Sequence, residues 1–247
     1  MINHHVYGSK NDPLVVFTHG IGEHSGLYLG FKDYLVQNGF SVLLYDLRGH
    51  GESESLEGFK DYKVFINDLH DLIINNRKKG QKTFLIGQSL GAIISNAYLT
   101  YQKDIDGIIS MSYQYRYIRK VKYLGFIFPN KVLKFNWRDP RSRHEKKEED
   151  ILDVKLLKQI EFRWLYQTLI KANQRVHKTI KEQTTPILVL HGGADRIVEP
   201  NNACYHFEQS VKRKKDIIIY PNSKHDLLLD IDQTIVYKDI VDWLKGH

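Results

Sequence analysis

One serine in the sequence has surroundings that favour nucleophilic catalysis, Ser89 in the string Gly87-Gln88-Ser89-Leu90-Gly91. A serine hydroxyl is a weak nucleophile at neutral pH, so it needs a base that takes its proton and a carboxylate that orients this base. The Gly-x-Ser-x-Gly pattern alone is a weak signal, because both residue types are common. It leaves open an ordinary glycine turn with a helix-capping serine. Whether Ser89 is a nucleophile or a capping residue therefore depends on its partner residues and on the elements that flank it.

Two residues downstream of Ser89 fit the roles of acid and base. Asp195 ends the loop that follows the apolar run 187–190, and a simple turn aspartate is its alternative role. His225 ends the loop that follows the apolar run 217–220, and a surface histidine is the alternative there. When the nucleophile occupies a strand-to-helix turn, the acid and then the histidine follow it along the chain. We therefore predict a triad of Ser89, Asp195 and His225.

Three other acidic residues compete with Asp195 for the role of orienting carboxylate. Asp226 is adjacent to His225 and cannot easily reach the imidazole nitrogen that points away from the serine. Asp46 follows an earlier apolar run, and we expect it to brace the turn after that run. Glu199 is a weaker substitute, so Asp195 remains the preferred acid.

Two backbone N–H groups are expected to stabilise the oxyanion of a tetrahedral intermediate. One belongs to Leu90, the residue after the nucleophile. The other is expected in the loop His19-Gly20-Ile21-Gly22-Glu23-His24, whose glycines let the backbone turn toward the site, and Ile21 is the preferred donor. The histidines and the glutamate of this loop have no helix-spaced partner and do not match a zinc pattern. We expect neither a metal nor a cofactor.

The elements that must position these residues are visible as alternating strand and helix patterns. Nearly continuous apolar runs, typical of a parallel sheet covered on both faces, predict strands at 14–18, 41–45, 83–86, 107–111, 187–190 and 216–220. Helical spacing of apolar residues falls between them, at 27–37, 62–77, 90–101, 201–212 and 232–244. The alternation predicts a doubly wound α/β fold with a mostly parallel sheet, in which Ser89 stands between a strand and a helix.

The alternation stops between Ser112 and Thr185. A basic, aromatic stretch there is followed by the charge run 144–150 and by a helical pattern from Leu152 onward. Ligands of open α/β sheets bind outside the carboxyl ends of the strands, so an insertion at this place is expected to form a lid. A chain of 247 residues fits one core. We therefore expect a single domain over 1–247 with a lid at about 113–185.

Composition and charge narrow the class of protein. The first residues do not resemble a signal peptide and no apolar run reaches membrane-spanning length, so we expect a cytoplasmic protein. The single cysteine, Cys204, excludes an internal disulfide. The net charge of +7 would suit a nucleic acid, an anionic lipid surface or an acidic substrate. No nucleic-acid-binding module accompanies the basic residues at 116–143, so we expect no nucleic-acid partner. Two interpretations of the basic lid remain. It either makes a peripheral contact with a membrane, or it is a lysine-rich face that is merely solvated.

Taken together, the motifs resemble the α/β-hydrolase superfamily, and within it the branch of lysophospholipases and monoacylglycerol lipases. The similar segments are the oxyanion loop 19–25 with Tyr28, the turn 46–53, the elbow 87–91, the segments 186–198 and 224–244 and, more faintly, 138–140 in the lid. The resemblance implies an α/β-hydrolase fold with a serine triad of Ser89, Asp195 and His225. It also implies an oxyanion hole made by the amides of Ile21 and Leu90.

The sequence departs from this branch in several places. Gln88 stands where the branch usually has histidine, and Ala92 stands where it has a second glycine, but neither side chain has a catalytic role. Relatives usually have a two-stranded lead-in, and only 2–13 is available here, so at least one early strand is expected to be missing. The lid is unusually basic and aromatic around 113–117, which affects the choice of substrate more than the chemistry.

The expected function is hydrolysis of a carboxylic ester through an acyl-enzyme. Apolar lid residues, among them Phe126, Phe128 and Trp137, either bind the acyl chain or simply pack the lid. The resemblance favours monoacylglycerols or lysophospholipids as substrates. A thioesterase or acyltransferase with the same triad, and a non-catalytic binding protein with a hydrolase fold, are the alternatives.

Overall fold

A seven-stranded sheet with the order β1-β3-β2-β4-β5-β8-β9 forms the centre of the computed structural model, which describes residues 1–56, 61–146 and 148–247. Its strands are β1 His4–Tyr7, β2 Leu14–Thr18, β3 Ser41–Tyr45, β4 Thr83–Gln88, β5 Gly107–Met111, β8 Ile187–Gly192 and β9 Lys215–Tyr220. Only the β1–β3 pairing in this sheet is antiparallel. The predicted α/β-hydrolase fold is confirmed, and a single strand, β1, forms the lead-in.

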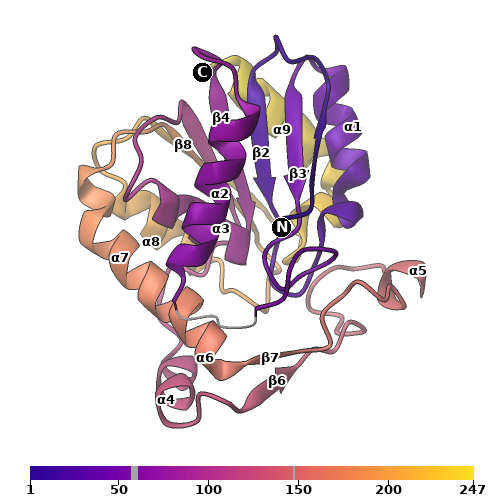
Figure 1. The fold of residues 1–247 in the computed structure, drawn as a ribbon, viewed down its shortest axis with the longest axis vertical. Coiled ribbons are helices and arrows are strands. Elements are labelled where there is room, and N and C mark those ends of the chain that lie inside the picture. Colours follow the sequence, from indigo (N-terminus) through magenta and orange to yellow (C-terminus); the bar gives the residue numbers. More distant parts are fainter. Residues whose placement is uncertain (57–60, 147) are drawn as a thin grey trace.

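Helices cover both faces of the sheet (Figure 1). On one face lie α1 Leu29–Gln37 and α9 Gln233–Lys245, and on the other lie α2 Lys63–Asn76, α3 Leu90–Tyr98 and α8 Asn201–Gln209. Alternate side chains of each strand feed the two cores, as Val15 and Val16 of β2 do. The inner strands β2, β3 and β5 are therefore fully buried, which explains why their sequences are continuously apolar rather than alternating.

The chain between β5 and β8 contains the segment that we predicted to be a lid, and it is called the lid below. Its elements are α4 Arg119–Ile127, β6 Val132–Lys134, α5 Glu148–Ile151, β7 Gln159–Glu161, α6 Phe162–Leu165, a π-helix Tyr166–Ala172 and α7 Asn173–Thr179. The helical pattern predicted from Leu152 onward is wrong for its first part, because β7 pairs with β6 and the helix begins only at Phe162. Lys147, inside the predicted lid range, lies outside the described residues.

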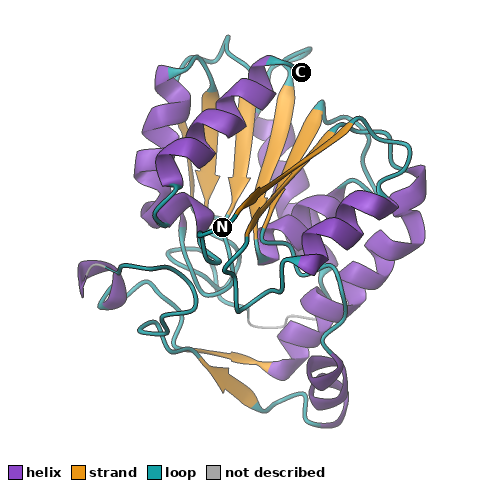
Figure 2. Ribbon diagram, turned by 180° about the vertical axis from the view of Figure 1, so that it is seen from behind, coloured by secondary structure: helices purple, strands orange, loops and turns teal. Residues whose placement is uncertain are grey.

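The loops that carry the predicted triad all leave the same edge of the sheet. Strands β4, β8 and β9 run parallel, and Ser89, Asp195 and His225 follow their respective carboxyl ends. The lid lies beyond this edge, below the arrowheads of the strands in Figure 2. Across the described parts of the chain, no helix combines the length and the apolar character needed to cross a membrane.

Candidate active site

Ser89 occupies a sharp turn between β4 and α3. Its φ is +52° and its ψ is −110°, a conformation that residues with a Cβ atom rarely adopt. The N–H of Ser89 donates to the carbonyl of Met111 at 2.8 Å, which ties the turn to the end of the neighbouring strand β5. The predicted strand-turn-helix setting of Ser89 is therefore present.

Two glycines make this turn sterically possible. A Cβ atom at Gly87 would overlap the backbone of Gly91, where α3 starts. A Cβ atom at Gly91 would in turn overlap the carbonyl oxygen of Thr18, at the end of β2. The first glycine lets helix and strand approach each other, and the second lets the helix pack on the neighbouring strand. This contact with Thr18 is a close approach that the motif alone did not indicate.

Asp195 and His225 form a buried hydrogen-bonded pair. Nδ1 of His225 lies 2.7 Å from Oδ2 of Asp195, whose Oδ1 accepts the N–H groups of Ile197 and Val198 at 2.8 and 2.9 Å. Nε2 of His191 lies 3.3 Å from the same Oδ2. Burial opposes ionisation of Asp195, but the charge of His225 and these hydrogen bonds hold its pKa well below its usual range. The lowered pKa favours the anionic form of Asp195, and its hydrogen bond to Nδ1 of His225 matches the arrangement that the predicted triad requires.

The electrostatic surroundings of His225 favour its charged form. Burial by itself lowers the pKa of His225, but the charge and hydrogen bond of Asp195, together with the charges of Asp226 and Glu23, raise it to about 9. Burial also raises the pKa of Glu23, with help from the charge of Asp226, to about 7, and it raises the pKa of Asp226. From the sequence, Asp226 was expected only as a competitor of Asp195 for the role of orienting carboxylate. Its place next to His225 makes it an electrostatic neighbour of the imidazole instead.

The backbone of His225 is held by two buried side chains. Its carbonyl accepts Nε2 of Gln88 at 2.8 Å and Oγ of Ser112 at 2.7 Å. Gln88 precedes the nucleophile and Ser112 follows β5, so the histidine loop is fixed to the two strands nearest the elbow. The sequence offered no signal for this role, apart from the unusual glutamine itself.

A cavity of about 390 Å³ joins the predicted catalytic residues. Ser89, His225 and Ile21 line it, and Asp195 lies behind His225. Apolar side chains from the lid and from the loop after β8 form much of its wall: Ile118, Val121, Leu133, Leu165, Leu169 and Ile197. Polar side chains also line the cavity, among them those of Glu23, Asn136, Asp139, Lys146 and Asp226. The cavity can therefore accommodate a molecule with an apolar and a polar part.

The residues proposed to contact substrate are not all brought to this cavity. Trp137 lines it, but Phe126 and Phe128 do not. Their side chains are 77% and 53% exposed at the end of α4, because the cavity side of this segment is formed by Ile118 and Val121. An apolar residue on an amphipathic helix can face either side, and the sequence alone did not decide the orientation of α4.

The two predicted oxyanion donors lie on opposite sides of Ser89 in the sequence. Leu90 is the first residue of α3, where backbone N–H groups have no acceptor within the helix. Ile21 lies in the loop after β2, which is braced by Oε2 of Glu23 accepting the Gly20 N–H at 2.7 Å. Oε2 of Glu23 also accepts the Tyr28 hydroxyl at 2.7 Å. Glu23 thus shapes the loop that carries Ile21, a role that sequence analysis missed.

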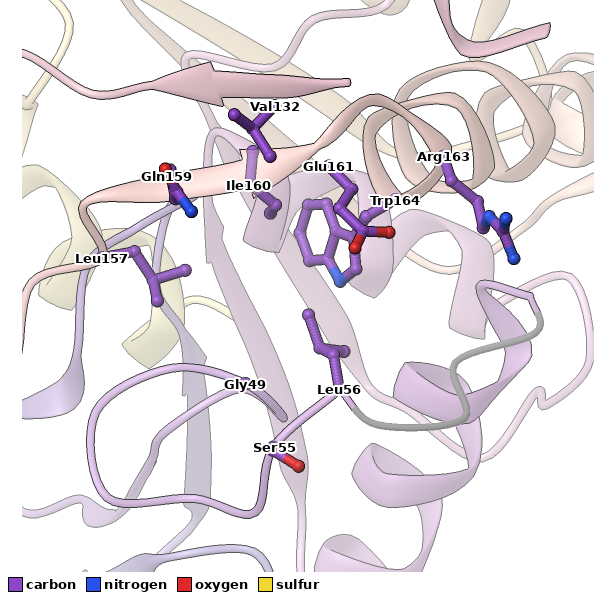
Figure 3. A pocket seen from close by; sticks show the side chains of 10 residues that line it. All are labelled: Gly49, Ser55, Leu56, Val132, Leu157, Gln159, Ile160, Glu161, Arg163 and Trp164. Atoms are coloured by element: carbon purple, nitrogen blue, oxygen red, sulfur yellow. The ribbon is translucent and has the colours of Figure 1, made fainter. Parts of the chain in front are cut away.

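A second, larger cavity of about 580 Å³ is shown in Figure 3. Leu56 points there toward Ile160 and Trp164, and Leu157 and Val132 complete the apolar wall. Val132 of β6 lines this second cavity, whereas its neighbour Leu133 lines the catalytic one. The β6–β7 pair thus separates the two cavities. Among the residues that the structure describes, no cluster of three or more His, Cys, Asp or Glu side chains could hold a metal ion.

A family model decides the family of this chain. The model described as serine aminopeptidase, S33 (Hydrolase_4), matches residues 9–232. The chain belongs to this family. Like its relatives, this S33 protein is an enzyme of the hydrolase class with the α/β-hydrolase fold.

Named relatives of the S33 protein are lipases. A monoglyceride lipase homolog from monkeypox virus is 28% identical over 265 residues, which covers 94% of this chain and 88% of that protein. The human monoglyceride lipase is 28% identical over 251 residues, covering 94% and 82% of the two chains. The crystal structure of Paleococcus ferrophilus monoacylglycerol lipase superposes with a TM-score of 0.88 at 25% identity, covering 100% of this chain and 99% of that one. These similarities place the S33 protein among monoacylglycerol lipase-like serine hydrolases.

Proposed function

We propose that the protein hydrolyses acyl esters of the monoacylglycerol or lysophospholipid type through an acyl-enzyme on Ser89. The observation that carries this proposal is one cavity lined by both Ser89 and His225, with His225 hydrogen-bonded to Asp195 and an apolar wall nearby. The names of the relatives, monoglyceride and monoacylglycerol lipases, support the ester substrate. The lysophospholipid part of the proposal rests on the resemblance of the motifs.

In the proposed mechanism, Oγ of Ser89 attacks the ester carbonyl while Nε2 of His225 takes the hydroxyl proton. Asp195 keeps the remaining proton on Nδ1 of His225 and stabilises the imidazolium. The N–H groups of Ile21 and Leu90 donate to the oxyanion of the tetrahedral intermediate. The imidazolium then protonates the leaving alcohol. In the second half, His225 takes a proton from water and the resulting hydroxide attacks the acyl carbon. As the bond between this carbon and Oγ of Ser89 breaks, the imidazolium returns the proton to Oγ, and the fatty acid leaves.

The two parts of the cavity wall suggest how such a substrate would lie. We assign the acyl chain to the apolar wall that includes Val121 and Leu169, where its burial is favourable. We assign the polar head group to the neighbourhood of Glu23, Asp226 and Lys146, whose charges act on one another. A carboxyl pair beside an ammonium group offers both hydrogen-bond donors and acceptors to hydroxyl groups of the leaving alcohol.

A labelling and turnover experiment tests this function. The wild type is expected to react with a fluorophosphonate probe and to hydrolyse monoacylglycerols or lysophospholipids, and Ser89→Ala is expected to lose both activities. Ser95→Ala is the matched control, because Ser95 is a buried serine of α3, the helix that follows Ser89, and its hydroxyl has no hydrogen-bond partner among the described residues. A labelled protein that cleaves only acyl thioesters, or that transfers the acyl group to an added alcohol rather than to water, would replace ester hydrolysis by one of the alternatives. Absence of Ser89-dependent labelling would overturn the mechanism.

We also propose that α4 contacts anionic membrane surfaces. The exposed side chains of Tyr123, Phe126 and Ile127 stand beside three exposed basic residues of the same helix, Arg119, Lys120 and Lys122. Apolar side chains bordered by cations suit the interface of a bilayer that contains anionic lipid. Co-sedimentation with phosphatidylcholine vesicles, with and without phosphatidylserine, tests the contact. Phe126→Ser is expected to weaken binding, whereas Ile74→Ser, at an exposed apolar position of α2, is expected not to. Equal binding of both variants would contradict the proposal.

A further inference from the structure

The lid contacts the oxyanion loop at Gly22. This residue has a φ of +79°, and a Cβ atom placed on it would lie 2.7 Å from Cζ2 and 3.0 Å from Cη2 of Trp137. The six-membered ring of the indole therefore lies directly on Gly22. Because Gly22 follows Ile21, the indole packs one residue away from the predicted oxyanion donor.

Leu157 closes a three-membered network between lid and loop. Its N–H donates to the carbonyl of Gly22 at 2.9 Å, and its own carbonyl accepts Nε1 of Trp137 at 2.7 Å. Each of the three residues thus touches the other two. Nζ of Lys146 donates to the carbonyl of Trp137 at 2.8 Å and to that of Asp139 at 2.6 Å, which anchors the turn that carries the indole.

The hydrolase core holds a different part of the same loop. His19 accepts the Leu47 N–H through Nε2 at 2.9 Å. Oε2 of Glu23 accepts both the Gly20 N–H and the Tyr28 hydroxyl. These interactions fix the loop at residues 19, 20 and 23. Ile21, whose N–H is the predicted oxyanion donor, therefore lies between two fixed residues. The core holds Gly20 and the lid holds Gly22.

We propose that Trp137, acting with Leu157, is a positioning residue for the oxyanion hole: by fixing Gly22 it aims the Ile21 N–H at the carbonyl oxygen of the substrate. The inference rests on the proposed function, since it takes Ser89 as the nucleophile and Ile21 as a donor. It assigns the lid a part in catalysis beyond covering the acyl chain. An oxyanion donor is effective only when it is held in place before the charge develops, so a loosened Gly22 lowers the rate even for small esters.

Trp137→Ala and Trp137→Phe separate the two interactions of Trp137, the contact of its ring with Gly22 and its hydrogen bond to the Leu157 carbonyl. The alanine variant loses both the ring on Gly22 and the donor to Leu157, whereas the phenylalanine variant keeps a ring and loses only the donor. With p-nitrophenyl acetate, whose acyl group has a single methyl, we expect kcat of Trp137→Ala to fall about ten- to a hundredfold with KM changed less than about threefold. This is less than the roughly 10²- to 10³-fold loss that follows removal of a whole donor. A smaller loss is expected for Trp137→Phe.

The decisive measurement compares two inhibitors that differ in charge at the reacting carbon. A trifluoromethyl ketone adds Ser89 to give a tetrahedral oxyanion, whereas the matching methyl ketone binds as a ground-state analogue. Trp137→Ala should lose about tenfold or more in the ratio of the two affinities, and Phe128→Ala, which removes an exposed lid aromatic outside the cavity, should keep the wild-type ratio. Loss of affinity for both ketones alike would mean that Trp137 only contacts substrate, and would overturn the inference.

Folding and the nucleophile are checked separately. Thermal melting identifies any variant that is unfolded, and Trp137→Phe, which retains an aromatic side chain, carries the test if Trp137→Ala does not fold. An unchanged affinity ratio in a folded Trp137→Phe would then overturn the inference. If the wild type itself shows no Ser89-dependent fluorophosphonate labelling, the proposed function fails. If labelling is present and the ratios of both Trp137 variants match wild type, only the role of Trp137 fails.

Discussion

The carbonyl oxygen of Thr18 occupies the space that a Cβ atom of residue 91 would need. Because the backbones of Thr18 and Gly91 are both buried, neither can move away without separating α3 from β2. We expect Gly91→Ala to lower the free energy of unfolding by at least about 3 kcal/mol, at the upper end of overpacking effects, or to prevent folding. Urea denaturation followed by circular dichroism measures the change.

A second glycine serves as the control for this prediction. Gly30 lies within α1, and a Cβ atom there would come no closer than 4.0 Å to a neighbouring atom. Gly30→Ala should be neutral or stabilise the protein by up to about 1 kcal/mol, because alanine has the higher helix propensity. Equal destabilisation by the two substitutions would show that the Thr18 contact is not the cause.

Replacing Asp195 by asparagine should preserve the loop and disable the base. Oδ1 of the new amide can still accept the N–H groups of Ile197 and Val198, but its NH₂ group would face Nδ1 of His225. The imidazole would then carry its proton on Nε2 and could not accept one from Ser89. We expect kcat to fall on the order of 10³- to 10⁴-fold, with melting temperature changed little beyond the lost ion pair. A variant that retains a tenth of wild-type kcat would exclude Asp195 as the orienting acid.

The pH dependence of the reaction should report the charges around His225. The imidazole must be neutral to act as a base, so kcat/KM should rise with pH through the pKa of His225, which Asp195, Asp226 and Glu23 raise to about 9. Asp226→Asn removes one of these charges, so the rising limb should move to lower pH. The control is Asp71→Asn, at an exposed position of α2, which should leave the limb in place. A limb that moves to higher pH would contradict the assignment.

The raised pKa of His225 also affects the stability of the fold. Stability should fall as the pH rises, whereas kcat/KM should rise. A histidine whose pKa rises from 6.5 in the unfolded chain to about 9 in the folded protein stabilises the fold fully below pH 6.5. This contribution is lost as the pH rises from 6.5 through about 9. Denaturation at pH 6 and pH 9 should therefore show a larger decrease in stability for wild type than for His225→Gln. An equal decrease in both proteins would argue against a raised pKa.

The two donors to the His225 carbonyl should depend on each other. Gln88→Leu leaves the carbonyl bonded to Ser112, and Ser112→Ala leaves it bonded to Gln88, so each change should cost about 1 kcal/mol. The double variant leaves a buried carbonyl without either donor. Its loss of unfolding free energy should exceed the sum of the single losses by about 1 kcal/mol or more. Strict additivity would mean that the two donors act independently.

The sheet and the order of the proposed triad could be predicted because both depend on local patterns. Strands β2, β3 and β5 have the predicted boundaries, since continuous apolar runs between polar turns leave little choice for a buried parallel strand. The loops after β4, β8 and β9 then converge because parallel strands end at one edge. The hydrogen bond between His225 and Asp195 follows from that topology.

The arrangement of the lid could not be predicted because it depends on packing between distant segments. The segments 132–134 and 159–161 are short and largely exposed, so their apolar pattern does not identify them as a pair of strands. The orientation of Phe126 depends on which face of α4 meets the cavity. The contact of Leu157 with Gly22 is made through backbone atoms, and backbone hydrogen bonds across such a distance leave no signature in residue type.

The hydrogen bond from Gln88 to the His225 carbonyl joins residues 137 positions apart. During synthesis on the ribosome the nucleophile and its glycines emerge long before the base, because chains grow from the N-terminus. In the unfinished polypeptide, Ser89 has no His225 to accept its proton. Gln88 and Ser112 likewise have no His225 carbonyl to which they can donate. Under the proposed mechanism, hydrolytic capacity therefore arises only once β9 has joined the sheet and the segment that carries His225 has reached Ser89.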